Sequence, residues 1–378
     1  MILAAFFIYI LYGFLVLYMT HGIGRLKDLD FDGSEPEASF SILVPFRNEE
    51  LNLTGLLQSI TSLNYPTEKF ELILINDASS DTSASIVQQC IEQYPNLKIK
   101  LIDSVRQSGS PKKDALDHGI QQASFEWIVT TDADCVVPVS WLSAFDNMIR
   151  QQPLQMIVAP VSYRDQKGFF HRFQMLDFIS LQGITMGSFG MKDKNFGHPF
   201  LCNGANLCYK KDCFNEVNGF VGNQHIASGD DVFLLEKIYQ KFPDEVQFIK
   251  SKEAIVYTSS KDTFRGLVQQ RVRWAAKTNA YNSIFAKLIG LLVFMTSFMM
   301  VILFILGSIG QLPWLHVGFL FLLKFNIDFV LLFKTSQFFA QEKVMKSYFV
   351  SSLLHPFYTV FVVLLSFNKT YTWKDRSY

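Results

Sequence analysis

The stretch FEWIVTTDADC, residues 125–135, runs from an apolar segment directly into two carboxylates, Asp132 and Asp134. The apolar half predicts a short buried strand. Two acids one residue apart repel each other, and removing them from water is costly, so a positive partner is expected beside them. The stretch therefore predicts a strand that ends at a charged site.

The segments before this strand repeat a strand–helix pattern. Runs typical of strands are 38–46, 70–77, 97–103 and 125–132. Runs with helical apolar spacing are 51–63, 82–94 and 112–123. The alternation predicts an α/β domain with a mostly parallel, doubly wound sheet. Because ligands bind beyond the carboxyl ends of such strands, polar residues within 47–50, 76–81 and 132–134 are candidate site residues.

The composition indicates a membrane protein more than a nucleic-acid-binding one. Of the 378 residues 49% are hydrophobic and 15% aromatic, and 34 Lys and Arg balance 34 Asp and Glu. A balanced charge offers no footprint for nucleic acid, so no such partner is expected. The five cysteines form no CxxC pair, which favours reduced thiols on the cytoplasmic side over zinc or disulfides.

Charge-free segments at both ends predict membrane helices. Residues 2–19 carry no charge and as a helix span about 27 Å, so we expect an uncleaved anchor over 1–22. A signal peptide is the alternative, but a basic n-region and a cleavage site are missing. Between these ends we expect one α/β domain over 35–285.

The C-terminal part, 286–368, predicts transmembrane or interfacial helices. A hairpin over 288–308 and 313–333 is expected, then an apolar run over 348–367. Lys324 and Asp328 within the hairpin are spaced to pair on one helix face, a structural role. The basic tail 369–378 favours the inside, so the run 348–367, with His355-Pro356, is a candidate re-entrant segment.

The first candidate site residues are acids at strand ends and two neighbouring lysines. Asp132 and Asp134 suit Mg²⁺ or Mn²⁺ with phosphates as further ligands, although an N-cap acid with a solvated neighbour is the plainer alternative. Asp77 is placed to accept from a base or ribose, while Asp81 or Ser80 caps the next helix. Lys112 and Lys113 face either phosphate or solvent.

Two later motifs complete the candidate set. In ASGDDVFLL, 227–235, Asp230 is expected as an N-cap, and Asp231 in the first turn is held charged by the helix dipole and suits a general base. In QQRVRWAAK, 269–277, one face carries Gln270, Arg273 and Trp274, which suit a diphosphate and a stacked ring. Alternatively this helix contacts anionic lipid, a role suited to Arg271 and Lys277.

The run 171–182 predicts an amphipathic helix at the membrane surface.

Taken in order, the motifs closely resemble glycosyltransferase family 2, which has the GT-A fold. The resemblance covers roughly 38–280 and rests on VPFRNEE, INDASSDTS, a lysine before an AL pair, TTDADC, NGANLCYKK, GDD and QRVRW. The QxxRW motif resembles the membrane-embedded branch, which includes cellulose, hyaluronan and ceramide-glucosyl synthases. The fold expected from the resemblance is a GT-A domain flanked by transmembrane helices.

The resemblance implies a role for each matched residue. The nucleotide-contacting positions are Pro45, Glu49 and Asp77, and Lys112 lies near the diphosphate. The DxD acids are Asp132 and Asp134, with Asp134 the direct ligand of Mn²⁺ or Mg²⁺. Asp231 is the catalytic base, and the residues near the diphosphate and acceptor are Gln270, Arg273, Trp274 and Asp230. Two positions depart from the usual pattern: Asp230 replaces a Glu, and Asn76 replaces the first acid of DDGS.

The function expected from this set is inverting, metal-dependent transfer from a UDP- or GDP-linked sugar. The acceptor would be a lipid-linked sugar or a polysaccharide, with a single transfer to a lipid-linked acceptor favoured over a processive synthase. The expected location is the bacterial inner membrane, with the catalytic domain cytoplasmic and membrane lipids as partners. The rivals are a nucleotidyltransferase, a transporter subunit and an inactive scaffold with a nucleotide-binding domain.

Overall fold

The chain divides into two compact units in the computed structural model, which describes residues 2–192, 198–226, 228–277, 283–367, 372–373 and 376–377. The sheet unit comprises 27–164 and 201–259. The helical unit comprises 1–26, 165–200 and 260–378. The expected domain 35–285 therefore includes two segments that pack with the apolar helices.

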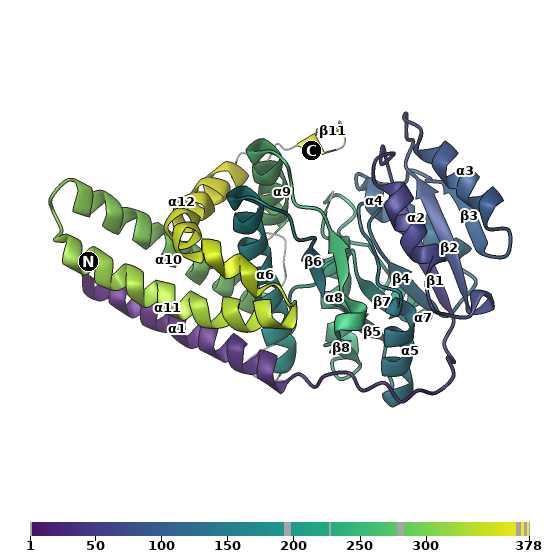
Figure 1. Cartoon of the computed structure of the whole chain (residues 1–378), viewed down its shortest axis with the longest axis horizontal. Coiled ribbons are helices and arrows are strands. Elements are labelled where there is room, and N and C mark those ends of the chain that lie inside the picture. The colour runs from purple at the N-terminus through teal and green to yellow at the C-terminus, as the bar shows by residue number, and fades with distance from the viewer. Residues whose placement is uncertain are drawn as a thin grey trace. The chain divides into compact units, whose positions relative to one another are not determined.

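The first half of the sheet unit has the predicted strand–helix alternation (Figure 1). Its strands are β1 (Phe40–Phe46), β2 (Phe70–Asn76), β3 (Lys98–Asp103) and β4 (Trp127–Thr130). Its helices are α2 (Leu53–Thr61), η1 (Thr67–Lys69), α3 (Ser83–Gln93) and α4 (Pro111–Gln122). Each predicted strand and helix is confirmed to within a few residues at its ends.

The second half of the unit adds shorter elements. Its strands are β5 (Met156–Val158), β6 (Val161–Tyr163), β7 (Leu207–Lys210), β8 (Val246–Phe248) and β9 (Val256–Thr258). Its helices are α5 (Trp141–Gln151), α7 (Lys211–Glu216), α8 (Asp230–Lys241) and η2 (Lys252–Ala254). The main sheet has the order β3-β2-β1-β4-β7-β5-β8, and only β7 runs antiparallel to its neighbours. Strands β6 and β9 form a separate parallel pair.

The close approach of α4 to the sheet depends on a glycine. A Cβ at Gly119 would meet Leu43 Cδ2 of β1 at 2.4 Å and Ile75 Cδ1 of β2 at 2.9 Å. Both neighbours are fully buried in the core. The helix can therefore lie directly on β1 and β2, and this fixes the position of its first turn at the edge of the sheet.

The helical unit contains the predicted apolar helices. The helices of this unit are α1 (Ile2–Arg25), α6 (Phe169–Gly190), α9 (Phe264–Ala276), α10 (Ile284–Ser308), α11 (Trp314–Phe338), η4 (Glu342–Ser347) and α12 (Tyr348–Ser366), followed by the short β10 (Thr372–Trp373) and β11 (Arg376–Ser377). Four segments are long and apolar enough to cross a membrane: α1, α10, α11 and the run 342–366. The predicted hairpin 288–308 and 313–333 is present as α10 and α11. Most of the expected basic tail 369–378 lies outside the described residues.

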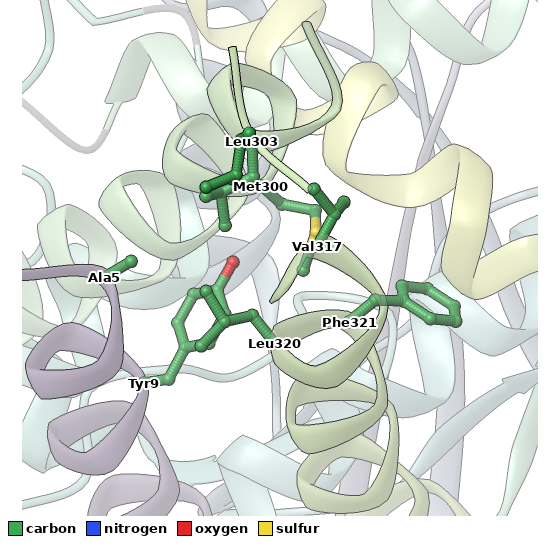
Figure 2. Close-up of a cluster of buried hydrophobic side chains, with 8 residues drawn as sticks. Ala5, Tyr9, Met300, Leu303, Val317, Leu320 and Phe321 are labelled. Carbon is green, nitrogen blue, oxygen red and sulfur yellow. The ribbon is translucent and has the colours of Figure 1, made fainter. Parts of the chain in front are cut away.

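Apolar packing joins α1, α10 and α11 (Figure 2). Figure 2 shows Tyr9 of α1 beside Leu320 of α11, with Met300 of α10 and Val317 of α11 nearby. Farther along, Asp328 accepts a hydrogen bond from the Tyr12 hydroxyl at 2.6 Å and pairs with Lys324. The expected pair Lys324–Asp328 therefore forms and also holds α1 against α11.

Helix α6 differs from the amphipathic surface helix expected over 171–182. It is a single 22-residue helix with buried side chains around most of its circumference. Its glycines allow backbone contact with α1, since a Cβ at Gly187 would lie 2.5 Å from the Met19 carbonyl oxygen. The expectation was wrong because the apolar periodicity of 171–182 reflects packing against other helices of the unit.

Candidate active site

The site lies at the carboxyl edge of the parallel strands in the sheet unit. Strands β1, β2 and β4 are mutually parallel, so the segments after them begin at the same edge. The acids Asp132 and Asp134 follow β4, and Asp77 follows β2. The topology therefore brings together the polar segments that the sequence placed at strand ends.

An ammonium group lies between acids from two distant parts of the chain. Lys112, in the first turn of α4, contacts Asp132 Oδ1 at 2.7 Å and Asp230 Oδ2 at 3.1 Å. Burial alone would lower the pKa of Lys112, but the carboxylates of Asp132, Asp230 and Asp231 raise it above its ordinary value. Lys112 is therefore the positive partner that the acids at the end of the strand require.

The antiparallel strand β7 brings a loop to the same edge. Because Thr130 at the end of β4 pairs with Leu207 at the start of β7, residues just before β7 lie beside the DxD segment. The Thr130 hydroxyl donates to the Gly204 carbonyl at 2.9 Å. A Cβ at Gly204 would meet Asp230 Oδ2 at 2.9 Å and Lys112 Nζ at 3.3 Å, so the loop backbone lies directly against the charged cluster.

A buried asparagine holds this loop in place. Asn206 is fully buried, and its amide nitrogen donates to the carbonyls of Pro160 at 2.7 Å and Ala254 at 2.8 Å. Its amide oxygen accepts from the Trp141 indole at 2.9 Å. Satisfied buried networks of this kind are rigid. The loop therefore offers a fixed backbone surface next to the acids.

Asp231 lies beside the loop at the start of α8. Its Oδ2 accepts from the Gly204 backbone N–H at 3.3 Å and its Oδ1 from its neighbour Val232 at 2.8 Å. Hydrogen bonds from N–H groups and the helix N-terminus both favour the charged carboxylate. Asp230 is the first residue of the helix, and the N-cap is Gly229 in the left-handed region, so the expected N-cap role of Asp230 was wrong.

The donor set fits a hard divalent cation that shares its ligands with a phosphate. Asp132 and Asp134 present carboxylate oxygens from one strand-end turn, and both side chains are partly exposed. Within the described ranges, no three His, Cys, Asp or Glu side chains form a group that could hold a metal alone. Mg²⁺ is commonly bound by one or two carboxylates together with substrate phosphates, and this turn offers such a pair.

The segments after β1 and β2 are locked together. Asn48 and Ala78 both have positive φ, of 51° and 52°. The Asn48 amide oxygen accepts from the Ser80 backbone at 2.9 Å, and Arg47 Nη1 donates to the Asp77 and Ala78 carbonyls at 2.8 Å each. Such conformations cost energy and persist where surrounding contacts hold them, often at functional sites.

Asp77 has an arginine partner that the sequence interpretation missed. Arg106 Nη2 contacts Asp77 Oδ1 at 2.7 Å. Arg106 follows β3, the third parallel strand, whose carboxyl end lies at the same edge. Ligands bind beyond the carboxyl ends of parallel strands, which is why 47–50 and 76–81 were candidate segments, and the same rule could have identified Arg106.

Other expected residues near this edge have mixed outcomes. Pro45 is partly buried within β1, and the Glu49 carboxylate accepts from the Asn52 amide at 2.7 Å. Lys113 does not face solvent: its side chain is 1% exposed, and its Nζ donates to the carbonyls of Asn223 and Ile226. Asp81 Oδ1 accepts from the Ser83 N–H at 3.0 Å, although the N-cap of α3 is Thr82.

The remaining predicted residues lie in the helical unit, on α9. Gln270, Arg273 and Trp274 share this helix, as their spacing predicted. Arg271 differs from its expected role: its side chain is 6% exposed and pairs with Asp177 of α6, so it is not a lipid-facing surface residue. The sequence signal was ambiguous because two arginines two positions apart on a helix can face different environments.

Comparison with known proteins finds a family match over the first part of the chain that contains the site. Residues 41–216 match the model of Glycosyl transferase family 2. This segment is therefore similar to a family 2 glycosyltransferase domain. It includes the DxD acids, Lys112 and the Gly204 loop, whereas Asp230, Asp231 and α9 lie beyond it.

Curated relatives support the same family. The chain is 28% identical over 236 residues to a poly-beta-1,6-N-acetyl-D-glucosamine synthase of Staphylococcus epidermidis, covering 62% of this chain and 53% of that protein. It is 24% identical over 273 residues to the synthase of the same name in Staphylococcus aureus strain COL, covering 71% of this chain and 61% of that one. The chain thus spans little more than half the length of these relatives.

A solved structure supports the fold. The mannosyltransferase PcManGT of Pyrobaculum calidifontis, in complex with GDP-Man and Mn²⁺, matches with a TM-score of 0.59 and 18% identity over 94% of this chain and 99% of that one. The predicted GT-A fold with a mostly parallel sheet is confirmed.

Proposed function

We propose that this protein is a membrane-anchored, inverting glycosyltransferase that moves a sugar from a UDP- or GDP-linked donor to a lipid-linked or polysaccharide acceptor. The observation that carries the proposal is the contact of Lys112 with both Asp132 and Asp230. It unites the DxD segment, the first turn of α4 and the acids of α8 at the carboxyl edge of the sheet. If the protein were a nucleotidyltransferase, Asp231, the residue after Asp230, would have no role.

The donor would lie across the carboxyl edge of the sheet. Pro45, Glu49 and Asp77 would line the nucleotide, with a ribose hydroxyl or a base N–H donating to the Asp77 carboxylate. The Lys112 ammonium would contact the diphosphate, which offers it a higher charge than either carboxylate. Asp134 and Asp132 would hold Mn²⁺ or Mg²⁺, an ion that neutralises charge developing on a leaving diphosphate.

The chemistry assigned to the chain's own residues is a proton transfer coupled to displacement. Asp231 would accept the proton of an acceptor hydroxyl while that oxygen bonds to the anomeric carbon. The bond from this carbon to the diphosphate oxygen breaks, and the nucleoside diphosphate leaves with the electron pair. One in-line displacement inverts the anomeric configuration. Gln270, Arg273, Trp274 and Asp230 would contact the diphosphate and the acceptor.

A processive polysaccharide synthase is the second candidate. It is favoured by the two relatives, each named a poly-beta-1,6-N-acetyl-D-glucosamine synthase. The two candidates share the donor site and differ in the fate of the acceptor. Size analysis of the products separates them, because a processive enzyme gives long chains and a single transfer gives one added sugar.

The deciding experiment measures donor cleavage by the detergent-solubilised protein. A panel of UDP- and GDP-sugars is tested with Mn²⁺ or Mg²⁺, using wild type, Asp134→Ala and Asp231→Ala. Both variants should lose turnover by about 100-fold or more, and only Asp134→Ala should weaken metal-dependent donor binding. Asp212→Ala, at an exposed acid of the same unit, is the control. Binding and cleavage of none of the donors would favour a scaffold or transporter subunit.

We place the catalytic domain on the cytoplasmic side of a bacterial inner membrane. The four helices that are long and apolar enough to cross a membrane support anchoring, and nucleotide sugars are made in the cytoplasm. Accessibility of Cys202 to a membrane-impermeant thiol reagent tests the orientation. Labelling in inverted vesicles but not in intact cells is expected.

A further inference from the structure

The side chain of Arg271 contacts two neighbours on its own helix and one on another. Its Nη1 donates to the Gln270 amide oxygen at 2.6 Å, and its guanidinium lies 4.3 Å from the centroid of the Trp274 ring. Its Nε contacts Asp177 Oδ2 at 2.7 Å. One buried group therefore touches two of the three α9 residues assigned to the diphosphate and acceptor.

The carboxylate that holds Arg271 has a second support. Asp177 lies on α6, and its other oxygen faces His355 Nε2 of α12 at 3.1 Å. Burial alone would raise the pKa of Asp177, but Arg271 and His355 lower it to about 2. The carboxylate therefore stays charged and connects α9 to two other helices of the unit.

Apolar packing beside Arg271 and Asp177 holds α6, α9 and α12 together. Leu267 and Val272 of α9 pack with Phe173 of α6 and with Tyr358 and Val362 of α12. In addition, the centroid of the Trp274 ring lies 6.1 Å from that of the Phe178 ring on α6. The guanidinium is therefore held in place by its bonds to Asp177 and Gln270 and by its position over the Trp274 ring.

From this geometry we propose that Arg271 is a positioning residue that orients Gln270 and Trp274 for the sugar-transfer reaction, with Asp177 and His355 as its supports. The inference rests on the proposed function, because that function assigns Gln270 and Trp274 to the diphosphate and acceptor. Arg271 itself need not touch substrate. A planar guanidinium can bond two acceptors and stack on a ring at once, whereas an ammonium cannot reproduce this geometry.

The substitution Arg271→Lys separates positioning from structural support. Lysine keeps the positive charge beside Asp177 but loses the fork and the planar face. The melting temperature in detergent should stay within a few degrees of wild type, while kcat for donor turnover should fall about 10- to 100-fold, because a misplaced contact group has effects of this size. The same change at Arg265, an exposed position on α9, is the matched control.

A double-substitution cycle tests whether the effect passes through Gln270. In a Gln270→Ala background, Arg271→Lys should lower kcat by much less than in wild type, because the group that it orients is gone. Equal fold losses in the two backgrounds would overturn this part of the proposal. Wild-type kcat in Arg271→Lys would overturn the whole of it.

A spectroscopic measurement keeps the test independent of turnover. Arg271→Lys should change tryptophan emission in the wild-type background and leave it unchanged in Trp274→Phe, since the stacked cation is the cause. If wild type cleaves no donor, the proposed function fails, and the emission spectra alone decide whether Arg271 positions Trp274. Spectra that match wild type would then overturn the positioning.

Discussion

The positive charge of Lys112 compensates the negative charges of Asp132 and Asp230. Replacing it by alanine leaves Asp132 and Asp230 facing each other without a cation. Lys112→Ala should lower stability by about 1–3 kcal/mol, because an unpaired, partly buried charge is costly and solvent at Asp132 reduces that cost. Donor turnover should fall at least tenfold.

Thermal unfolding and donor cleavage measure both effects of the change at Lys112. The control is Lys241→Ala, since Lys241 pairs with Glu216 on the surface of the same unit. A Lys112→Ala protein that melts and turns over like the control would contradict the central role of this ammonium.

The lowered pKa of Asp177 predicts that the stability of the fold depends on pH. Its pKa is lowered from 3.8 to about 2, although burial alone would raise it, so the charged form contributes about 2 kcal/mol. Because the folded-state pKa lies below the ordinary one, this contribution is full above about pH 5 and is lost as pH falls through the range from 3.8 toward 2.

The substitution Asp177→Asn isolates this contribution. At pH 7 the variant should melt well below wild type in detergent, and the gap should narrow as the pH is lowered from 5 to 3. A gap of constant size over this range would show that the charge of Asp177 is not the stabilising feature.

At the scale of elements, glycines decide how closely helices approach. A Cβ at Gly187 of α6 would meet the backbone of α1, with 2.5 Å to the Met19 oxygen and 2.8 Å to its Cα. Because backbone cannot rotate away, Gly187→Ala should separate the two helices and lower stability by about 1–3 kcal/mol. Gly318→Ala on α11, where a Cβ meets nothing within 4 Å, is the matched control.

Melting temperatures of the two alanine variants measure the difference between the two glycines. The Gly318→Ala protein should melt at or above the wild-type temperature, since alanine favours helices. Equal melting temperatures for both variants would mean that α1 and α6 do not need their close contact.

The elements in the first half of the sheet unit were predictable because their signals are local. Apolar runs of four to nine residues and helical spacing mark β1 to β4 and α2 to α4, and strand ends place Asp77, Asp132 and Asp134 at one edge. Helix α6 was not predictable as a packed helix, because burial around its circumference depends on distant partners. The same reason hid the partners of Arg271 and Lys113, which come from residues far away in the sequence.

At the scale of the whole molecule, α1, which is long and apolar enough to cross a membrane, is also part of the packed core of the helical unit. It packs against α6, α10 and α11 within the helical unit. Removing residues 2–25 should therefore expose buried faces of these helices and cause aggregation in detergent. Replacing α1 by a polyleucine helix of equal length should not restore a single peak in size-exclusion chromatography. A monodisperse truncated protein would contradict this prediction.

The hydrogen bond from Tyr12 to Asp328 has a consequence for the order of assembly during synthesis. The two residues are 316 positions apart. At about 5–20 residues per second, α1 waits roughly a quarter of a minute to a minute for its partner to be made. The segments of the sheet unit emerge in the meantime. Helix α1 can thus pack against α6 before α11 has been made, and until then the Tyr12 hydroxyl must bond to another group, such as water or lipid.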